Sequence, residues 1–235
     1  MSDEKHIISF KYVFNIVKTG EEILHIVRLD KRNIQSQLDE SKTLPAWAKL
    51  DYKRCDNCKL PDTEYCPVAA RLVEPIEKFQ KYKSQFDCNV TVISHERAYI
   101  KETNIQDGLH SLFGLLMATS GCPTMKQLSP MALNHLPFAS LEETIYRVVS
   151  MHLLKSYLQD REHNFMPGAM KKLDQIYSEV SDVNIAMTKR LAGFVSNDST
   201  LNAVVGLDAL RFMVPTNMEK TLKIFENTFV DQENI

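Results

Sequence analysis

Four cysteines have types and spacing that could support chemistry in this chain. Three of them lie in the polar stretch RCDNCKLPDTEYCP, as Cys55, Cys58 and Cys66, and a fourth, Cys122, follows in SGCP. The first three form Cys-x2-Cys-x7-Cys, and a Cys-x2-Cys turn lets two thiolates converge on one ion. A structural zinc site needs four ligands, so we predict that Cys122 is the fourth. The sequence therefore predicts a tertiary contact between the loop and a distant segment.

Two of these cysteines, Cys66 and Cys122, immediately precede a proline. Proline is favoured at the first position of a helix, so each cysteine is predicted at a helix N-cap. There the unpaired backbone N–H groups and the helix dipole favour a negative sulfur and lower the thiol pKa. Three basic residues flank the turn and would either offset part of the thiolate charge or be ordinary solvated loop residues: Lys53, Arg54 and Lys59.

The cysteine pattern leaves the bound group open. Zinc fits the Cys-x2-Cys spacing, whereas an iron–sulfur cluster also takes four cysteines and often has a Cys-Pro step at its closing ligand. The thiols could instead form a redox switch, or Cys66 and Cys122 could be small buried hydrophobes with no ligand role. Zinc is the expected cofactor and an iron–sulfur cluster is the alternative. The fifth cysteine, Cys88, begins a predicted strand and is assigned to the core.

Two histidines could also bind a group, His135 as a further metal ligand and His110 as a ligand of a cofactor such as haem. His135, in the helix break HLPFAS, could line a pocket or add a metal ligand, since neutral imidazole is a common one. A hydrogen-bonded histidine at a helix end is the competing interpretation. His110 lies in an apolar helix, where a lone histidine is usually a core residue. The chain has no nucleophile elbow, no glycine-rich phosphate loop and no His-Glu-x-x-His, so the motifs favour binding over catalysis.

The elements that must position the cysteines begin with a predicted small sheet. Alternation of apolar residues over 8–16, a turn, and a second run over 23–29 predict a β-hairpin. Residues 88–101 predict a third strand, bent near Ser94, or two short strands. A helix that opens at Pro67 is predicted to cover the sheet. Residues 1–102 are thus expected to form an α+β unit of about three antiparallel strands, with the cysteine-rich loop at 55–66.

From residue 103 onward the pattern is helical. Residues 105–118 are apolar on most faces, which predicts a central helix surrounded by others. Ser140 and Glu143 form a capping box for the next long helix. A helix is also expected to start after Cys122 and meet Pro130, and three more are expected over 169–195, 200–214 and 218–229, giving about six in all. The fold class is therefore α+β, with a predominantly helical domain at 103–235 packed on the first unit or forming one continuous domain with it.

Composition and charge restrict the class of protein. The 235 residues are 44% hydrophobic and 25% charged, and the formal charge is −2 with both signs interspersed. This gives no basic footprint for nucleic acid, and no apolar stretch reaches the roughly 20 residues that span a bilayer. The N-terminus lacks a signal-peptide pattern, so we expect a cytoplasmic protein, where clustered cysteines indicate metal or redox chemistry. The expected partner is an unknown protein or small-molecule ligand, with no nucleic acid and no membrane.

Several of these motifs resemble those of an uncharacterised bacterial family of unknown function. The resemblance rests on CDNCKLPDTEYCPVA, GLLMATSGCP and PMALNHLPFASLEETIYR, and it runs from about Trp47 to Leu210. It implies no reaction and no catalytic residues, but it does imply that the four cysteines and the His135 segment belong to one site. We therefore expect a metal-containing binding or regulatory protein whose four-cysteine site joins its two parts. An iron–sulfur or thiol-based redox sensor is the alternative.

Overall fold

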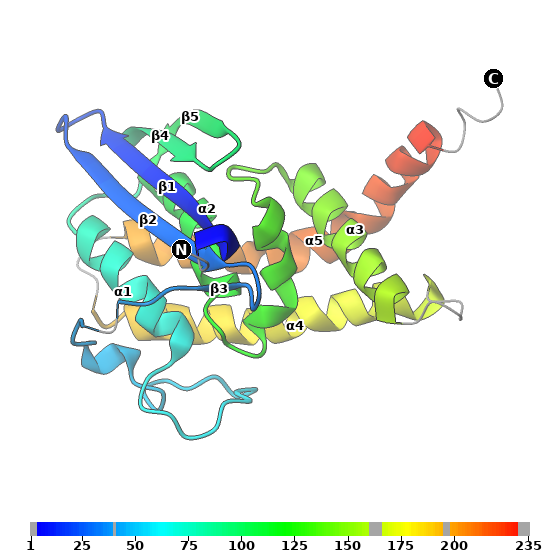
Figure 1. Cartoon of the computed structure of the whole chain (residues 1–235), viewed down its shortest axis with the longest axis horizontal. Helices are drawn as coiled ribbons and strands as arrows, with labels where there is room; N and C mark the ends of the chain where they lie inside the picture. The colour runs from blue at the N-terminus through cyan, green and yellow to red at the C-terminus, as the bar shows by residue number, and fades with distance from the viewer. Residues whose placement is uncertain (1–3, 40, 160–165, 195–197, 230–235) are drawn as a thin grey trace.

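The protein is described from a computed structural model, which describes residues 4–39, 41–159, 166–194 and 198–229. Within these ranges an antiparallel sheet packs against helices (Figure 1). The strand order is β3-β2-β1-β4-β5. In chain order the strands are β1 (Ile7–Ile16), β2 (Glu22–Asp30), β3 (Gln35–Ser36), β4 (Asp87–Ile93) and β5 (Ala98–Asn104).

The helices cover the buried face of the sheet and extend beyond it. Those described are η1 (Glu4–His6), η2 (Ala46–Ala48), α1 (Pro67–Phe79), α2 (Ile105–Ala118), η3 (Met125–Asn134), α3 (Leu141–Gln159), α4 (Met166–Leu191) and α5 (Ser199–Phe229). Figure 1 shows α1 and α2 beside the sheet, whereas α3 and the end of α5 lie on the opposite side of the molecule. The α+β class predicted from the sequence is therefore confirmed.

The sheet has more strands than the sequence indicated. The predicted hairpin is present as β1 and β2, with Phe10 opposite Val27, and residues 88–101 form the two-strand option, β4 and β5. Five strands replace the expected three because β3 also pairs with the end of β2. Tertiary bonds hold this two-residue strand: the Ser36 N–H donates to the Thr119 carbonyl, and Arg71 donates to the Ser36 carbonyl. A strand this short leaves no periodicity to detect.

Helix α2 is the central helix that its apolar sequence predicted. It is buried along most of its length, and its N-terminal half lies directly on the sheet. At Gly108 a Cβ atom would lie 2.7 Å from the Phe14 ring and 2.9 Å from Val90. A side chain at Gly108 would therefore push α2 off the sheet. This close approach aligns the later half of α2, and the Cys122 segment that follows it, against the other helices.

One hydrophobic core contains residues from both predicted parts. It joins β1 residues such as Phe14 to α1, α2 and α4, and it includes Leu72, Leu112 and Val183. A second, smaller cluster packs α3 against α4 and α5 around Val148 and Val214. The division into residues 1–102 and 103–235 stays a prediction, and residues 160–165, 195–197 and 230–235 of the second part lie outside the described ranges.

Proline positions misled the prediction of helix ends. The two helices expected over 200–214 and 218–229 are one helix, α5, which contains Pro215, and α1 likewise contains Pro75. Proline removes one intrahelical hydrogen bond, but packing on either side can hold the helix together. Val214 and Met218 flank Pro215 and are both buried in the second cluster. Within the described ranges, five helices follow residue 103, where about six were expected.

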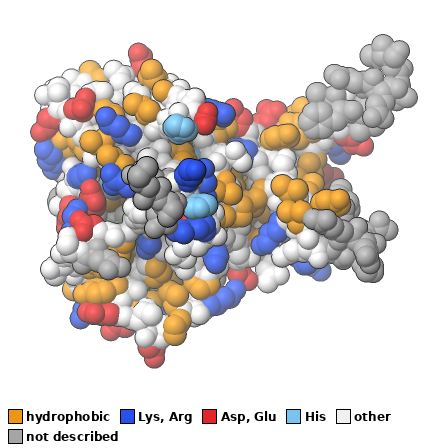
Figure 2. All heavy atoms as spheres, viewed as in Figure 1, with side chains coloured by type: hydrophobic (Ala, Val, Ile, Leu, Met, Phe, Trp, Pro, Cys, Tyr) orange, Lys and Arg blue, Asp and Glu red, His pale blue; other side chains and the backbone are white. Residues whose placement is uncertain are grey.

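The surface shows no segregation of charge on the face viewed in Figure 2. Lys and Arg side chains there are intermixed with Asp and Glu, and hydrophobic side chains gather near α3 and α5. Several exposed apolar residues belong to these two helices, among them Leu154 and Leu158. Across the described residues, no helix combines the length and the hydrophobicity that crossing a membrane would require.

Candidate functional site

The structure brings the four predicted cysteines together. Cys55, Cys58, Cys66 and Cys122 all line one small cavity of about 10 Å³, although they come from three separate segments. Cys55 and Cys58 are half-buried in the loop between η2 and α1, whereas Cys66 and Cys122 are buried, and all four are free thiols. Cys88 lies elsewhere, buried on β4, as its assignment to the core predicted. The shared cavity is therefore a candidate site built from distant parts of the sequence.

Cys66 lies at a helix N-cap, as the sequence predicted, whereas the prediction is wrong for Cys122, because the N-cap of η3 is Thr124. Cys66 is the N-cap of α1 with extended backbone angles, and Pro67 occupies the first turn. At Cys122, the Lys126 N–H donates to the Cys122 carbonyl, which starts a turn just before η3. The sulfur of Cys122 also accepts hydrogen bonds from the backbone N–H groups of Thr124 and Met125. Cys122 therefore contacts backbone N–H groups at the start of a turn, whereas the Cys66 side chain makes no capping hydrogen bond.

The expected lowering of thiol pKa does not occur at Cys122. Burial raises the pKa of this thiol, and the two N–H groups offset only part of that effect. Burial likewise raises the pKa of Cys55 to about 12, with the neighbouring cysteines adding to the shift. Desolvation disfavours a charged sulfur more strongly than a helix N-terminus favours it. Without a bound cation, the Cys55 and Cys122 thiols are therefore protonated near neutral pH.

A buried arginine that the sequence reading missed lies beside the thiols. Arg190 of α4 lines the same cavity and is only 1% exposed. Its guanidinium donates to three backbone carbonyls around η2: Trp47 at 2.9 Å, Lys49 at 2.6 Å and Leu50 at 3.0 Å. Its Nε is buried without a hydrogen-bond partner, and in the described ranges no carboxylate pairs with it. Arg190 thus places an unneutralised positive charge at the cysteine cavity, where it offsets a small part of the rise that burial and the other cysteines cause in the pKa of Cys55.

The basic residues predicted to flank the cysteine turn have different roles. Arg54 donates to Asp62 at 3.1 Å and to the Leu60 carbonyl at 2.8 Å, and a hydrogen bond with Cys58 raises the pKa of Arg54. Lys59 pairs with Glu179 of α4 at 2.8 Å, so it tethers the loop to that helix. Lys53 is exposed. Of the three, only Arg54 contacts a cysteine of the cavity.

The thiols do not form a ready ligand set. In the part of the chain that the structure describes, no three His, Cys, Asp or Glu side chains are grouped so that they could hold a metal ion. The four sulfurs therefore share a cavity without being arranged as ligands. His135, considered as an additional ligand, lines a different cavity and is not brought to the cysteines.

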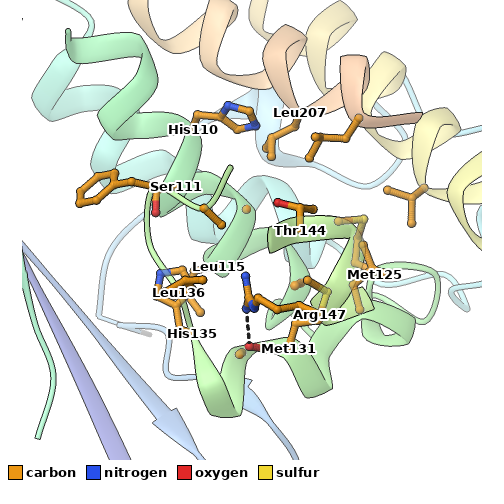
Figure 3. A pocket seen from close by; sticks show the side chains of 18 of the residues that line it. His110, Ser111, Leu115, Met125, Met131, His135, Leu136, Thr144, Arg147 and Leu207 are labelled. Carbon is orange, nitrogen blue, oxygen red and sulfur yellow. Dashed lines mark hydrogen bonds between the residues drawn. The ribbon is translucent and has the colours of Figure 1, made fainter. Parts of the chain in front are cut away.

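That second cavity is much larger, about 290 Å³, and lies among the helices (Figure 3). It is formed by side chains of α2, η3, α3, α4 and α5 together with the His135 loop. One wall is open because α2 presents small residues there: Ser111, Gly114 and Ala118. Volumes of about 300–1,000 Å³ are typical of small-molecule sites. The cavity is therefore a second candidate site.

His135 is fixed as a neutral, hydrogen-bonded residue at the edge of this cavity. Its Nε2 lies 2.5 Å from the hydroxyl of Tyr12, which also contacts the Ser111 hydroxyl at 3.2 Å. The Phe10 ring meets the imidazole edge-on at 5.1 Å. Burial lowers the pKa of His135 to about 3. The two interpretations of His135 thus coincide, because it is a satisfied helix-end histidine that also lines a pocket.

The buried histidines predict a loss of stability in acid. His135 has its pKa lowered to about 3 and His25 to about 4, both mainly by burial, whereas an unfolded histidine titrates near 6.5. The unfolded chain therefore binds protons first, so stability is complete above about pH 6.5 and falls as the pH drops toward 4. Urea unfolding between pH 7 and pH 4 should show this fall, with roughly 3 kcal/mol from each histidine.

His135→Gln should reduce the pH dependence, because glutamine can bond Tyr12 without titrating. The matched control is His95→Gln, since His95 is exposed. An equal pH slope in the wild type and in His135→Gln would contradict a buried neutral His135.

These features define an α+β protein with a small four-thiol cavity and a separate, larger cavity among its helices. A family model described as Domain of unknown function (DUF6901) matches residues 8–230, so the chain belongs to this family. No curated protein and no solved structure matches the chain. Membership of a family of unknown function agrees with the resemblance noted in the sequence, and the role of the cysteine and His-Leu-Pro-Phe-Ala motifs within that family stays a prediction.

Proposed function

We propose that this chain is a cytoplasmic, metal-containing binding or regulatory protein in which Cys55, Cys58, Cys66 and Cys122 hold one zinc ion. The supporting observation is the shared cavity, which collects four thiols from three segments of the chain. The ion would link the cysteine loop to the starts of α1 and η3, and so join the two predicted parts. Bound zinc would serve as a cross-link and supply folding energy, with no reaction assigned to it.

The chemical type of the four ligands fits zinc, but the arrangement of the four cysteines does not yet match a zinc site. Four sulfurs are an ordinary set for structural zinc, and each must lose its proton to bind. Arg190 offsets part of the charge that four thiolates bring, since it lies at the cavity without a carboxylate partner in the described ranges. The described cysteines are not grouped as a metal-ligand set, so binding one ion would require them to rearrange. The loop with Cys55 and Cys58 is the more exposed side, so it is the part expected to close.

The alternative is an iron–sulfur or thiol-based redox protein that uses the same four cysteines. Thiol chemistry without a metal is disfavoured, because the raised pKa values of Cys55 and Cys122 leave little reactive thiolate at neutral pH. An iron–sulfur cluster needs the same four ligands, and the donor set alone does not separate it from zinc.

Absorption of anaerobically purified protein separates these possibilities. A zinc protein is colourless, whereas an iron–sulfur protein absorbs in the visible range through its sulfur-to-iron bands. We expect no visible absorption, and none after exposure to air. A brown sample that loses its colour in the Cys122→Ala variant would contradict zinc and support the cluster. Cys88→Ala is the matched control, because Cys88 is a buried thiol outside the cavity.

The partner is proposed to be a small molecule or another protein, with the helical part supplying the binding surface. The 290 Å³ cavity favours the small molecule.

A further inference from the structure

The larger cavity is lined by charged as well as apolar side chains, and the charged ones indicate which ligands it could bind. Its walls are mainly apolar, and the aliphatic ones include Leu115, Leu128, Leu207 and Leu210. The ionised side chains among its lining residues are Lys101, Asp107 and Arg147. Figure 3 shows Arg147 reaching from α3 between the other side chains that line the cavity. A ligand that fills this space would therefore be apolar over most of its surface and would meet one or more charges.

Arg147 has N–H groups that are available to a ligand, because only its Nη2 makes hydrogen bonds within the described residues. Its Nη2 donates to the carbonyls of Met131 at 3.0 Å and Asn134 at 3.2 Å, near the end of η3. Its Nε and Nη1 make no hydrogen bond within the described residues, and Arg147 forms no ion pair there. Glu143 lies one turn earlier on α3 but forms no ion pair with Arg147. Its carboxylate accepts the Ser140 N–H at 2.7 Å, and its N–H donates to the Ser140 hydroxyl, which is the predicted capping box.

The other charged groups that line the cavity are exposed or already bonded, whereas Arg147 is half-buried. Asp107 is exposed and bonds with Asn104 in the N-cap of α2, through its backbone N–H and its carboxylate. Lys101 is exposed and lies 5.8 Å above the Phe138 ring. His135 is neutral and held by Tyr12. The half-buried guanidinium therefore has no ion-pair partner within the described residues, and the Glu143 carboxylate acts on its charge only at longer range. Burying such a charge is unfavourable unless it is paired.

From this geometry we infer that the cavity binds a small amphipathic monocarboxylate, with its carboxylate on Nε and Nη1 of Arg147 and its apolar body against the leucines and the Gly114–Ala118 face of α2. A guanidinium presents two parallel N–H groups that match a carboxylate in a bidentate pair. Arg147 is half-buried whereas Lys101 is exposed, so the cavity presents one partly desolvated cation and favours a ligand with one negative charge. This inference deepens the binding part of the proposed function and rests on it, but it is independent of the metal.

Calorimetric titration with three eight-carbon probes tests the inference. Octanoate, 1-octanol and octylamine share a chain and differ in head-group charge. We expect octanoate to bind the wild type at least about tenfold more tightly than 1-octanol, because hydrogen bonds between a guanidinium and a carboxylate are charge-assisted. Octylamine should bind least, because its ammonium group is repelled by Arg147. Equal binding of the three probes would overturn the carboxylate assignment while leaving a ligand cavity. Absence of binding by all three would overturn the binding proposal as well.

Variants separate the charge from the shape of the cavity. Arg147→Met should remove the preference for octanoate over 1-octanol, whereas Arg147→Lys should keep part of it. Ala118→Phe should reduce binding of both probes while leaving Arg147 in place. Arg97→Met is the matched control, because Arg97 is exposed and does not line the cavity. An unchanged octanoate preference in folded Arg147→Met would contradict the role of Arg147, and circular dichroism checks that each variant is folded.

Discussion

Replacing Arg190 with methionine is expected to lower the free energy of unfolding by about 3 kcal/mol or more. Methionine keeps most of the length of the side chain but donates no hydrogen bond. Three carbonyls, of Trp47, Lys49 and Leu50, would lose their charged donor. Trp47 and Leu50 are themselves buried, so water does not readily replace the guanidinium. Each such bond to a charged group contributes about 1.5–3 kcal/mol, and part of the sum is offset by no longer burying the charge.

Urea unfolding of Arg190→Met and of Lys189→Met measures this effect with a matched control. Lys189 precedes Arg190 on α4 and is exposed, so its replacement should change the stability by less than about 0.5 kcal/mol. Arg190→Lys should recover only part of the loss, because an ammonium group cannot reach three carbonyls with the geometry of a guanidinium. An Arg190→Met protein as stable as the wild type would mean that the buried cation does not hold the η2 segment in place.

Replacing Cys122 with alanine is expected to remove the metal and to lower the melting temperature by about 10 °C or more. The proposed ion cross-links three segments, so losing one of four ligands should release most of its contribution to folding. In a chain of this size each kcal/mol shifts the melting temperature by roughly 2–4 °C. Cys88→Ala removes an equally buried thiol from β4, outside the cavity, and should show only the effect of a small core vacancy.

A strong chelator distinguishes the metal from simple packing at Cys122. It should lower the melting temperature of the wild type and of Cys88→Ala, but leave Cys122→Ala unchanged because that variant has no metal to lose. A structural ion would be contradicted by a wild type that melts at the same temperature with and without the chelator and that differs from Cys122→Ala in stability only by the effect of the lost sulfur atom.

Local patterns predicted the elements that local forces determine. The alternation over 8–16 identified β1, the Ser140 and Glu143 spacing identified the cap of α3, and the Cys66-Pro67 step identified the start of α1. In each case the physical cause lies within a few residues. The cysteine spacing also pointed to Cys122, because a zinc site needs a fourth ligand from elsewhere in the chain. Cys122 lines the same cavity as the other three cysteines.

Features created by distant contacts could not be predicted in this way. Strand β3 exists because Ser36 bonds Thr119 and Arg71, and α5 continues through Pro215 because its neighbours are buried. Arg190 looks like an ordinary basic residue in the last turn of α4, since nothing in the sequence shows that the carbonyls of 47–50 surround it. The sequence predicted a lowered pKa for Cys122, and the prediction was wrong because burial, which raises this pKa, depends on tertiary contacts.

Elemental analysis of anaerobically purified protein directly tests whether the four cysteines hold one zinc ion. We expect one zinc per chain in the wild type and in Cys88→Ala, and less than a stoichiometric amount in Cys55→Ala and Cys122→Ala. Wild-type protein without stoichiometric zinc, or Cys122→Ala protein that retains a full equivalent, would contradict the zinc site.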